Sequence, residues 1–335
     1  MYPFERRRRL GLGGMGEVWL GVHQPTGLHV AIKSILSQRA SDPRFRRAFS
    51  REVEAVAGLD HPGIVLVFDH GVSDRGPYLV MEYASGGALD QQPGPGSWEE
   101  LQGTLLHLLD ALAHAHARDL LHLDLKPANV LLCGPEDLRP GLKLTDFGLA
   151  RARGDSRVSR SGTPQYMPPE QILGAWRQQG PWTDLYALSA MAWELASGEP
   201  PFLGEDPREQ HLSSPLPPLR PRIPVPSGLE AWLARGLAKH PSDRFSSAAS
   251  AAAALGQLGR AEGSAQERRF GRRRSSTTFV LGTLLDELDE RTVPLPAEDL
   301  LPVPERWRRP QERLVHGMHG AGLGLFGVRT VPFVG

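Results

Sequence analysis

Two short motifs in the middle of the chain constrain its fold and chemistry most. LHLDLKPAN spans residues 121–129, and LTDFG spans residues 144–148. An Asp can orient a hydroxyl and take its proton, a Lys can hold a transferring phosphate, and an Asn with a second Asp can ligate magnesium through hard oxygen atoms. The spacing therefore fits phosphoryl transfer from magnesium-bound ATP. The residues concerned are Asp124, Lys126, Asn129 and Asp146.

A glycine-rich run precedes these motifs. Residues 11–18 read GLGGMGEV, and missing Cβ atoms there let backbone amides approach phosphate oxygens. Alone, this spacing fits a phosphate-binding loop, a dinucleotide fold or a plain hairpin turn. The apolar run Val30-Ala31-Ile32 ends in Lys33 and is followed by a helical stretch carrying Glu52. That combination favours the phosphate loop.

Lysine is rare in this chain. Only four of the 38 Lys and Arg residues are lysines, and two of these are Lys33 and Lys126. A compact ammonium on a thin stem can enter a crowded phosphate site where a guanidinium fork would displace its neighbours. If the four lysines were distributed at random among the basic positions, they would rarely include both 33 and 126.

Residues from about Phe4 to about Leu258 resemble the eukaryotic-like Ser/Thr protein kinases of bacteria, with the motifs in the family's order. The run GTPQYMPPE at 162–170 is similar to the end of the family's activation segment. The resemblance implies an α+β, bilobal protein-kinase fold. We expect a small antiparallel β N-lobe with one main helix (about 4–81), a hinge (82–84) and a larger, mostly helical C-lobe (about 85–258).

The resemblance also implies the site residues. Asp124, Lys126, Lys33 and Glu52 are the expected catalytic residues, with Lys33 paired to Glu52 and pointing at the α- and β-phosphates. Asn129 and Asp146 are the expected ligands of Mg²⁺, with Mn²⁺ as an alternative. Met81 is the gatekeeper, Glu82 and Ala84 bind adenine through their backbone, and Ala31 and Leu131 enclose its ring. The full set of expected ATP-binding positions is Gly11, Leu12, Gly13, Gly14, Gly16, Val18, Ala31, Lys33, Met81, Glu82, Ala84 and Leu131.

Further positions resemble the family's structural anchors and its Ser/Thr branch. Asp184 is expected to steady the catalytic-loop backbone, and Arg244 to pair with Glu170. Lys126 and Thr163 are typical of kinases that act on Ser and Thr. We therefore expect a non-specific Ser/Thr protein kinase that uses ATP, acts on protein substrates and phosphorylates itself.

Two residues depart from the family pattern. Leu123 replaces an Arg that normally binds a phosphate on the activation segment, so phosphorylation of that segment loses its main partner. We expect activity to depend only weakly on such phosphorylation, although Arg151 is a potential substitute ligand. Pro168 replaces an Ala, and with Glu170 retained we expect local stiffening rather than loss of function.

Two other functions fit parts of the pattern. A pseudokinase scaffold would bind nucleotide or protein partners without transferring phosphate, but pseudokinases typically lack at least one of the motif residues present here. A small-molecule kinase of the same fold is disfavoured by the segment 162–170, which resembles a peptide-binding platform.

Length, charge and cysteine content agree with an intracellular enzyme. A kinase core of about 250–260 residues leaves a tail of about 75 in a chain of 335 residues. The formal net charge is zero, so we expect no nucleic-acid partner. The single cysteine, Cys133, excludes an internal disulfide. The sequence has neither a signal peptide nor an apolar run long enough to span a membrane, so we expect a cytoplasmic protein.

Periodicity and chain breakers predict the elements. Strands are expected around 18–20, 30–32 and 78–81, and an extended connector at 215–226. Helices are expected at about 43–58, 98–117, 184–197, 228–239 and 246–258.

Several conspicuous runs have simple interpretations. Four histidines at 107, 114, 116 and 122 resemble a metal cluster, but His114 and His116 cannot share a helix face. His122 is expected to support the backbone of the Asp-Phe-Gly motif. The run Arg6–Arg9 fits an exposed first strand better than a patch for anionic membranes. The run at 272–278, RRRSSTT, fits either a flexible linker or a phosphorylation site.

The segment 259–335 differs in composition from the rest. It is rich in Arg, Pro and Gly, contains the acidic stretch LLDELDE at 284–290, and is expected to be a largely disordered tail or linker. Its last residues, 331–335, are similar to the segment that precedes the nucleotide-binding domain of AAA-type ATPases fused to such kinases. An AAA-type ATPase is therefore a candidate partner or missing domain.

Overall fold

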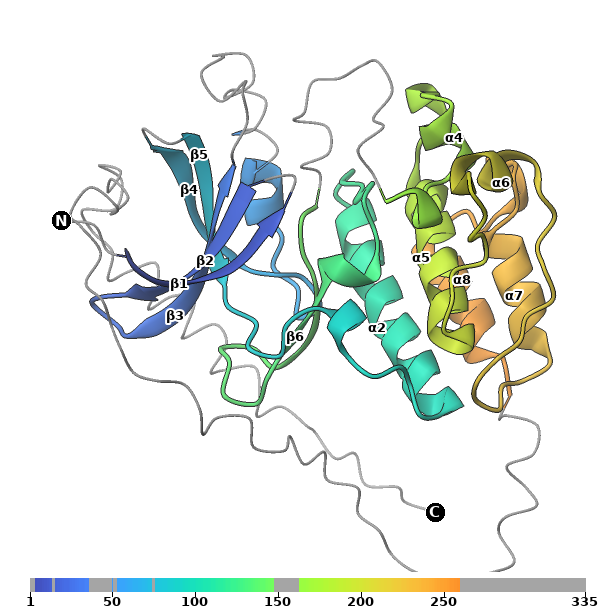
Figure 1. Ribbon diagram of the computed structural model, residues 1–335, viewed down its shortest axis with the longest axis horizontal. Coiled ribbons are helices and arrows are strands. Elements are labelled where there is room, and N and C mark those ends of the chain that lie inside the picture. The colour runs from blue at the N-terminus through green and yellow to red at the C-terminus, as the bar shows by residue number, and fades with distance from the viewer. Residues whose placement is uncertain are drawn as a thin grey trace, which may run out of the picture.

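Five antiparallel strands form one lobe of the computed structural model, and helices dominate the other (Figure 1). The structure describes residues 4–13, 16–35, 50, 53–73, 76–147 and 163–259. The sheet has the strand order β1, β2, β3, β5, β4, with antiparallel pairing throughout. The strands are β1 (Phe4–Gly13), β2 (Gly16–His23), β3 (Leu28–Ile35), β4 (Val67–Ser73) and β5 (Gly76–Glu82).

The central strand β3 is buried on both faces of the sheet. Val30 and Ile32 join an apolar cluster on one face, whereas Ala31 and Ile35 join a second cluster on the other. Successive side chains of a strand point to opposite faces, so a continuous apolar run suits a strand covered on both sides. Lys33 is thereby carried into the buried interior of this lobe.

The helical lobe is built around α5. Twelve of its 17 residues are buried, and it shares one apolar core with α2, α7 and α8, which lie beside it in Figure 1. The helices are α2 (Trp98–His116), α4 (Pro169–Ile172), α5 (Pro181–Ser197), α6 (Pro207–Ser213), α7 (Gly228–Gly236) and α8 (Ala248–Gly256). Short 3₁₀ helices are η1 (Leu89–Gln91), η2 (Pro127–Asn129), η3 (Pro164–Tyr166), η4 (Trp176–Gln178) and η5 (Pro241–Asp243), and β6 (Val130–Cys133) pairs with β7 (Gly141–Leu144).

Local chemistry explains where the helices begin. The Ser97 hydroxyl accepts a hydrogen bond from the Glu100 N–H at the start of α2, and the acidic side chains of the first turn suit its dipole. Helix α5 begins at Pro181, three residues earlier than predicted, because proline is tolerated in a first turn. There the Gly180 N–H donates to the Thr183 hydroxyl.

The predicted strands and the helical lobe are confirmed, with shifted boundaries. The predicted helices 98–117, 228–239 and 246–258 are each shorter in the structure, at 98–116, 228–236 and 248–256. The connector 215–226 contains no helix or strand, as predicted. Of the helix predicted at 43–58, residues 53–57 are helical, and most of the remainder lies outside the described residues. Elements that the prediction missed are β4, the β6–β7 hairpin, α4 and α6.

The arginine run lies in β1, but its exposure is not uniform. Arg7, Arg8 and Arg9 are exposed, whereas Arg6 is only 4% exposed. Its guanidinium donates to the Ser34 hydroxyl at 3.0 Å and lies over the Trp19 ring. The prediction of an exposed run is therefore wrong for Arg6, because its side chain faces inward like that of Phe4 two residues earlier. A register shift between Arg6 and Arg8 interrupts this alternation before Arg8.

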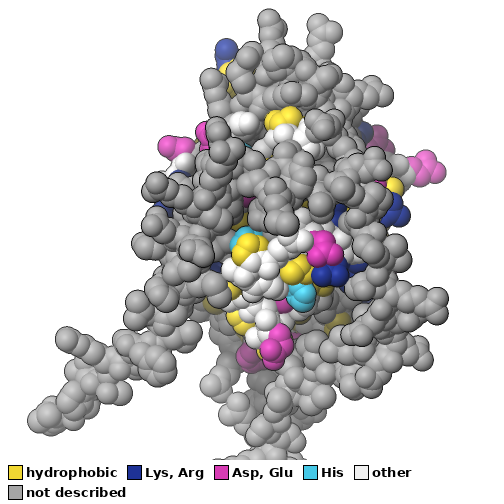
Figure 2. Space-filling view, turned by 90° about the vertical axis from the view of Figure 1, so that its left-hand side faces the viewer, with side chains coloured by type: hydrophobic (Ala, Val, Ile, Leu, Met, Phe, Trp, Pro, Cys, Tyr) yellow, Lys and Arg dark blue, Asp and Glu magenta, His cyan; other side chains and the backbone are white. Residues whose placement is uncertain are grey.

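The surface in view in Figure 2 carries a mixture of side chains. Acidic, basic, histidine and apolar groups are interspersed there among the described residues. None of the helices in the described ranges has the length and apolarity needed to cross a bilayer.

Candidate active site

One buried carboxylate holds the backbone of the loop that carries Asp124. Asp184, in α5, accepts hydrogen bonds from the N–H groups of His122 and Leu123, each at 2.8 Å. Leu123 has a φ of 64°, which is uncommon for a residue other than glycine. The Gln171 side chain donates to the Leu123 carbonyl at 2.8 Å. Both sides of this unusual turn are thus fixed, and the predicted anchoring contact of Asp184 is confirmed.

The ionisation of Asp184 is itself supported by its neighbours. Burial alone would raise the pKa of this carboxyl, but the hydrogen bond from His116 and the nearby His122 bring the pKa below its usual range. The His116 Nε2 lies 2.8 Å from the Asp184 Oδ2. The carboxylate therefore stays charged and can accept all three bonds.

The side chains of Asp124, Lys126 and Asn129 converge after that turn. The Lys126 ammonium lies 3.0 Å from the Asp124 Oδ2. The Asn129 amide donates to the Asp124 carbonyl at 2.7 Å and to its carboxylate at 3.2 Å. Asn129 belongs to η2, whose first residue is a proline, which suits the start of a helical turn. The short 3₁₀ turn thus brings three polar side chains of one nine-residue run together.

Asp146 joins this group from the end of the β6–β7 hairpin. Its Oδ2 lies 2.5 Å from the Lys33 Nζ, and both side chains are nearly buried. Burial alone would raise the pKa of Asp146, but the charge and hydrogen bond of Lys33 lower it overall. Its Oδ1 is buried and has no hydrogen-bond partner among the described residues. A buried, charged, unpartnered oxygen suits a cation ligand.

Apolar residues from both lobes form a cluster at the site predicted for adenine. Ala31 and Met81 are buried in it, and Val18 and Leu131 pack against it. The Glu82 N–H donates to the Leu66 carbonyl at 2.9 Å, so it is not available to donate to a ligand. Within the described residues, no hydrogen bond uses the N–H of Ala84.

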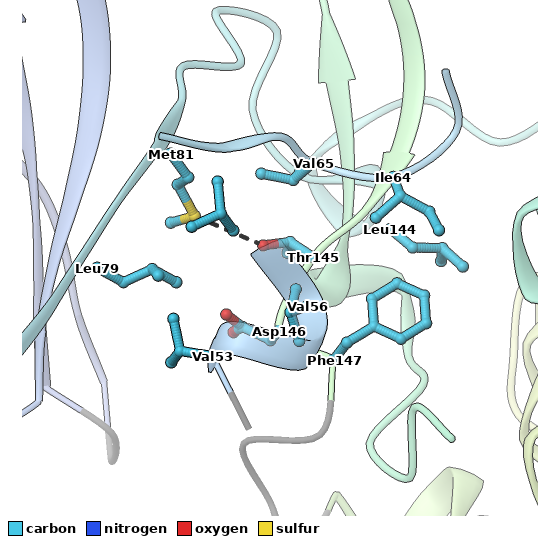
Figure 3. Close-up of a pocket in the computed structure, with 11 residues that line it drawn as sticks. Val53, Val56, Ile64, Val65, Leu79, Met81, Leu144, Thr145, Asp146 and Phe147 are labelled. Atoms are coloured by element: carbon cyan, nitrogen blue, oxygen red, sulfur yellow. Dashed lines mark hydrogen bonds between the residues drawn. The ribbon is translucent and has the colours of Figure 1, made fainter. Parts of the chain in front are cut away.

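A cavity borders this cluster between the lobes (Figure 3). Met81 lines it, and the Thr145 hydroxyl lies 3.9 Å from the Met81 sulfur. In Figure 3 the Asp146 carboxylate lies between Val53 and Val56, which belong to the helical residues 53–57. The remaining lining is mostly aliphatic, so this cavity is an apolar space beside the charged site.

The side chain of Glu82 ties the hinge to the rest of the molecule. It is 1% exposed and forms ion pairs with Arg139, at 2.5 Å, and Lys143, at 3.7 Å. Arg139 also donates to the Ile64 carbonyl, and Lys143 donates to the Pro62 carbonyl. The hinge, the hairpin and the loop before β4 therefore share one buried charge network.

The segment from Thr163 forms one wall of a second cavity, which adjoins Asp124 and Lys126. Thr163, Tyr166 and Met167 line it on that side. Thr163 therefore shares a cavity with Asp124 and Lys126, although the described structure has no hydrogen bond between its hydroxyl and either residue.

An ion pair fixes the far end of the same segment. The Arg244 guanidinium donates to both carboxylate oxygens of Glu170, at 2.8 and 2.9 Å, and both side chains are buried. This contact was predicted and is confirmed. Pro168 precedes α4 with a φ of −66°, the value a proline ring imposes. Its carbonyl accepts the bonds that start α4.

The four histidines have separate neighbours. His107 contacts the Leu142 carbonyl at 2.7 Å, and His114 packs against His61. The His122 ring lies 4.6 Å from the Phe147 ring, which agrees with the predicted support of the Asp-Phe-Gly motif. In the ranges that the structure covers, no three His, Cys, Asp or Glu side chains are arranged to hold a metal ion.

Some predicted residues cannot be placed. Glu52, Gly14, Gly148 and the segment 151–162 lie outside the described residues, as does the chain from 260 onward. Among the described positions, Gly11, Leu12 and Gly13 end β1, and Gly16 begins β2, so the glycine run joins two strands as predicted.

The prediction also missed several residues that shape the site. His116, Arg139 and His211 all make buried or nearly buried polar contacts with the functional segments. No local pattern marks them, because the partners Asp184, Glu82 and Gln165 lie 68, 57 and 46 residues away in sequence.

Known proteins share this arrangement. A family model described as a protein kinase domain matches residues 4–252. The Ser/Thr-protein kinase Pkn1 of Myxococcus xanthus is 38% identical over 257 residues, covering 73% of this chain and 37% of Pkn1. PknF of Mycobacterium tuberculosis is 36% identical over 262 residues, covering 74% of this chain and 55% of PknF. The chain thus matches about half or less of these relatives' length.

Solved structures agree with the sequence relatives. The kinase domain of PknI from Mycobacterium tuberculosis superimposes with a TM-score of 0.60 at 32% identity, covering 77% of this chain and 98% of that domain. The chain belongs to the protein kinase family and groups with the eukaryotic-like Ser/Thr kinases of bacteria.

Proposed function

We propose that this chain is an ATP-dependent protein kinase that transfers the γ-phosphate to Ser or Thr hydroxyls, including its own. The observation that carries the proposal is the convergence of Asp124, Lys126 and Asn129 beside the Lys33–Asp146 pair. Phosphoryl transfer needs positioning and charge stabilisation more than covalent chemistry. This group of side chains supplies both.

Asp124 and Lys126 act on the transferring group. The Asp124 carboxylate orients the substrate hydroxyl and accepts its proton. Lys126, held 3.0 Å from that carboxylate, stabilises the negative charge that moves from ATP to the substrate. Lys33 holds the α- and β-phosphates, with Glu52 as its proposed partner.

ATP lies between the lobes in this proposal. The amides of Gly11, Leu12, Gly13, Gly14 and Gly16 surround the phosphates. Val18, Ala31, Met81 and Leu131 enclose the adenine ring, and their shared apolar cluster supports that assignment. The Glu82 carbonyl and the Ala84 N–H bind the edge of the ring.

Members of this family use ATP with a divalent cation, and we assign its ligands to Asn129 and Asp146. The buried, unpartnered Oδ1 of Asp146 supports this assignment. The Asn129 amide nitrogen is engaged by Asp124, which leaves its oxygen for the cation. Bound Mg²⁺ or Mn²⁺ would neutralise charge on the β- and γ-phosphates, and Mg²⁺ commonly needs only one or two protein carboxylates.

The proposed domain organisation follows the sequence prediction. Residues 4–258 form the kinase domain, divided at the hinge 82–84, and 259–335 form a tail or linker. We propose protein substrates bearing Ser or Thr, and a cytoplasmic location. The AAA-type partner inferred from residues 331–335 stays a prediction, since this segment lies outside the described residues.

Transfer of labelled γ-phosphate tests the proposal. The chain is incubated with ATP and Mg²⁺ or Mn²⁺, alone and with a generic basic protein, and the products are analysed for phosphoamino acids. Phosphoserine or phosphothreonine made by the wild type and absent with Asp124→Asn supports the proposal. A folded wild type that binds ATP but transfers no label would instead indicate a pseudokinase scaffold.

A further inference from the structure

His211 of α6 is completely buried between η3 and α5. Its Nε2 lies 2.9 Å from the carbonyl oxygen of Gln165, in η3. Its Nδ1 lies 2.8 Å from the hydroxyl of Tyr186, in α5. The ring of Phe202 packs edge-on against the imidazole, with centroids 4.8 Å apart. One side chain therefore connects α6, α5 and η3.

The partners determine which nitrogen carries the proton. A backbone carbonyl can only accept, so the Nε2–H of His211 donates to Gln165. In a neutral imidazole the other nitrogen is an acceptor, so the Tyr186 hydroxyl donates to Nδ1. Burial lowers the pKa of His211 to about 4, which keeps the ring neutral near pH 7. Both bonds are thus oriented by a single tautomer.

Gln165 occupies the middle of the wall beside the proposed catalytic residues. Its neighbours Tyr166, Met167 and Thr163 line the cavity that adjoins Asp124 and Lys126. The Tyr166 hydroxyl donates to Glu194 of α5, and Glu170 is held by Arg244. These contacts bind side chains of the wall, whereas His211 binds its backbone.

The residues that hold the side chains of this wall also contact the residues around His211. The Arg244 guanidinium lies over the ring of Tyr186, 4.6 Å from its centroid. The Lys239 ammonium lies over the ring of Phe202 at 4.4 Å and donates to the Gln210 carbonyl of α6. His211 therefore rests on residues that are themselves fixed, so it can transmit the position of α6 to the segment at 163–167.

We propose that His211 is a positioning residue for the protein substrate, because it fixes the backbone of the wall that receives the substrate segment next to Asp124. This role rests on the proposed kinase function. It predicts an effect on the protein substrate and none on ATP, since His211 contacts none of the residues assigned to the nucleotide.

Steady-state kinetics with two varied substrates separate these effects. We expect His211→Ala to raise KM for a protein substrate by roughly five- to tenfold, the scale of one lost buried hydrogen bond. KM for ATP should stay within about twofold of wild type. His211→Gln can still donate from its amide and should recover part of the loss. The control is His240→Gln, which changes an exposed histidine.

Amide hydrogen exchange of the full chain, without substrate, gives a readout that does not depend on catalysis. The Tyr166 and Met167 amides bond to the Thr163 and Pro164 carbonyls. We expect their exchange to be faster in His211→Ala than in wild type and His240→Gln. Unchanged exchange in a folded variant would overturn the inference.

The kinetic results distinguish failure of the positioning role from failure of the proposed function. An active wild type whose His211→Ala variant keeps its substrate KM, or raises both KM values equally, would overturn the positioning role alone. A wild type that transfers no phosphate would overturn the proposed function, and the positioning role with it.

Discussion

The Lys33 ammonium lies 2.5 Å from the Asp146 carboxylate, although 113 residues separate the two in sequence. Lys33 comes from the central strand of the sheet, and Asp146 follows the β6–β7 hairpin. This pair therefore joins the two lobes at the proposed phosphate site. Removing the Lys33 charge should therefore affect both the chemistry and the ionisation of Asp146.

Lys33→Met should lower phosphoryl transfer by about 10²-fold or more, because a charge that stabilises the phosphates is lost. Burial would then act on Asp146 without its opposing charge, so the pKa of Asp146 should rise. Initial rates measured from pH 5 to 8 test both effects. Arg7→Met removes a cation from an exposed ion pair and should leave the rates unchanged.

Arg139→Met should weaken both stability and ATP binding. Glu82 would keep only Lys143 and the Leu66 N–H as partners for a carboxylate that is 1% exposed. We expect the free energy of unfolding to fall by about 2–3 kcal/mol and KM for ATP to rise several-fold.

Asp60→Asn is the matched control for Arg139. Asp60 is the other carboxylate partner of Arg139, and its side chain is 92% exposed. Its replacement should lower the free energy of unfolding by less than about 0.5 kcal/mol. Urea unfolding measures both variants. Equal losses would contradict the view that the buried Glu82 contact dominates.

Glu170→Gln should be strongly destabilising. It leaves the buried Arg244 guanidinium without its carboxylate, and breaking a buried pair costs about 3–5 kcal/mol. Glu5→Gln breaks the exposed pair with Arg7 and should cost no more than about 1 kcal/mol. Urea midpoints that move by the same amount in the two variants would refute the structural role of Glu170.

His211 should make the protein less stable in mild acid. The pKa of its ring is about 4 in the folded chain against an ordinary 6.5, so the unfolded chain binds the proton at higher pH. The contribution of His211 to the free energy of unfolding is fully present above about pH 6.5. It is lost as the pH drops toward 4, by roughly 2–4 kcal/mol in total.

Comparison with His211→Gln isolates this contribution from other acid-sensitive groups. Urea unfolding of both proteins at several pH values from 7 to 4.5 should show a steeper loss for the wild type. Parallel losses would mean that His211 is not held neutral by the fold.

The sequence correctly predicted which polar side chains lie together where these residues are close in the chain. Asp124, Lys126 and Asn129 lie within six residues, so one turn of chain brings them together. Apolar patterning likewise predicted α2, which buries one regular face, and β3, whose apolar run is buried on both faces. Helix α6 was missed, since seven residues with a mostly polar exterior carry little periodic signal.

The contacts that the sequence did not predict are mainly polar contacts between residues far apart in the chain. The roles of Arg139 and His211 depend on partners 57 and 46 residues away, brought close only by the packed fold. Arg6 shows the same limit, because a run of four arginines gives no sign that its first member packs over the Trp19 ring. Burial of a polar side chain becomes visible only when its partners are in place.

Activation should not require phosphorylation of the segment before Thr163. Leu123 occupies the position of the usual phosphate-binding Arg and is 9% exposed, so this position offers no cation. Ser156→Ala, Ser159→Ala and Ser161→Ala should each retain at least about half of wild-type activity, because a phosphate at any of these positions would not meet the usual Arg next to Asp124. Transfer rates of the phosphatase-treated variants test this, and abolition by any one of the three would contradict it.

The most direct test of the kinase assignment compares Asp124→Asn with Asp119→Asn. Both exchange an Asp for an amide of equal size, but Asp119 is exposed and its φ of 58° tolerates Asn. We predict that Asp124→Asn lowers the transfer rate at saturating ATP by at least about 10²-fold without changing ATP affinity, and that Asp119→Asn changes neither. Equal rates in all three proteins would contradict the assignment of Asp124 as the residue that accepts the substrate proton.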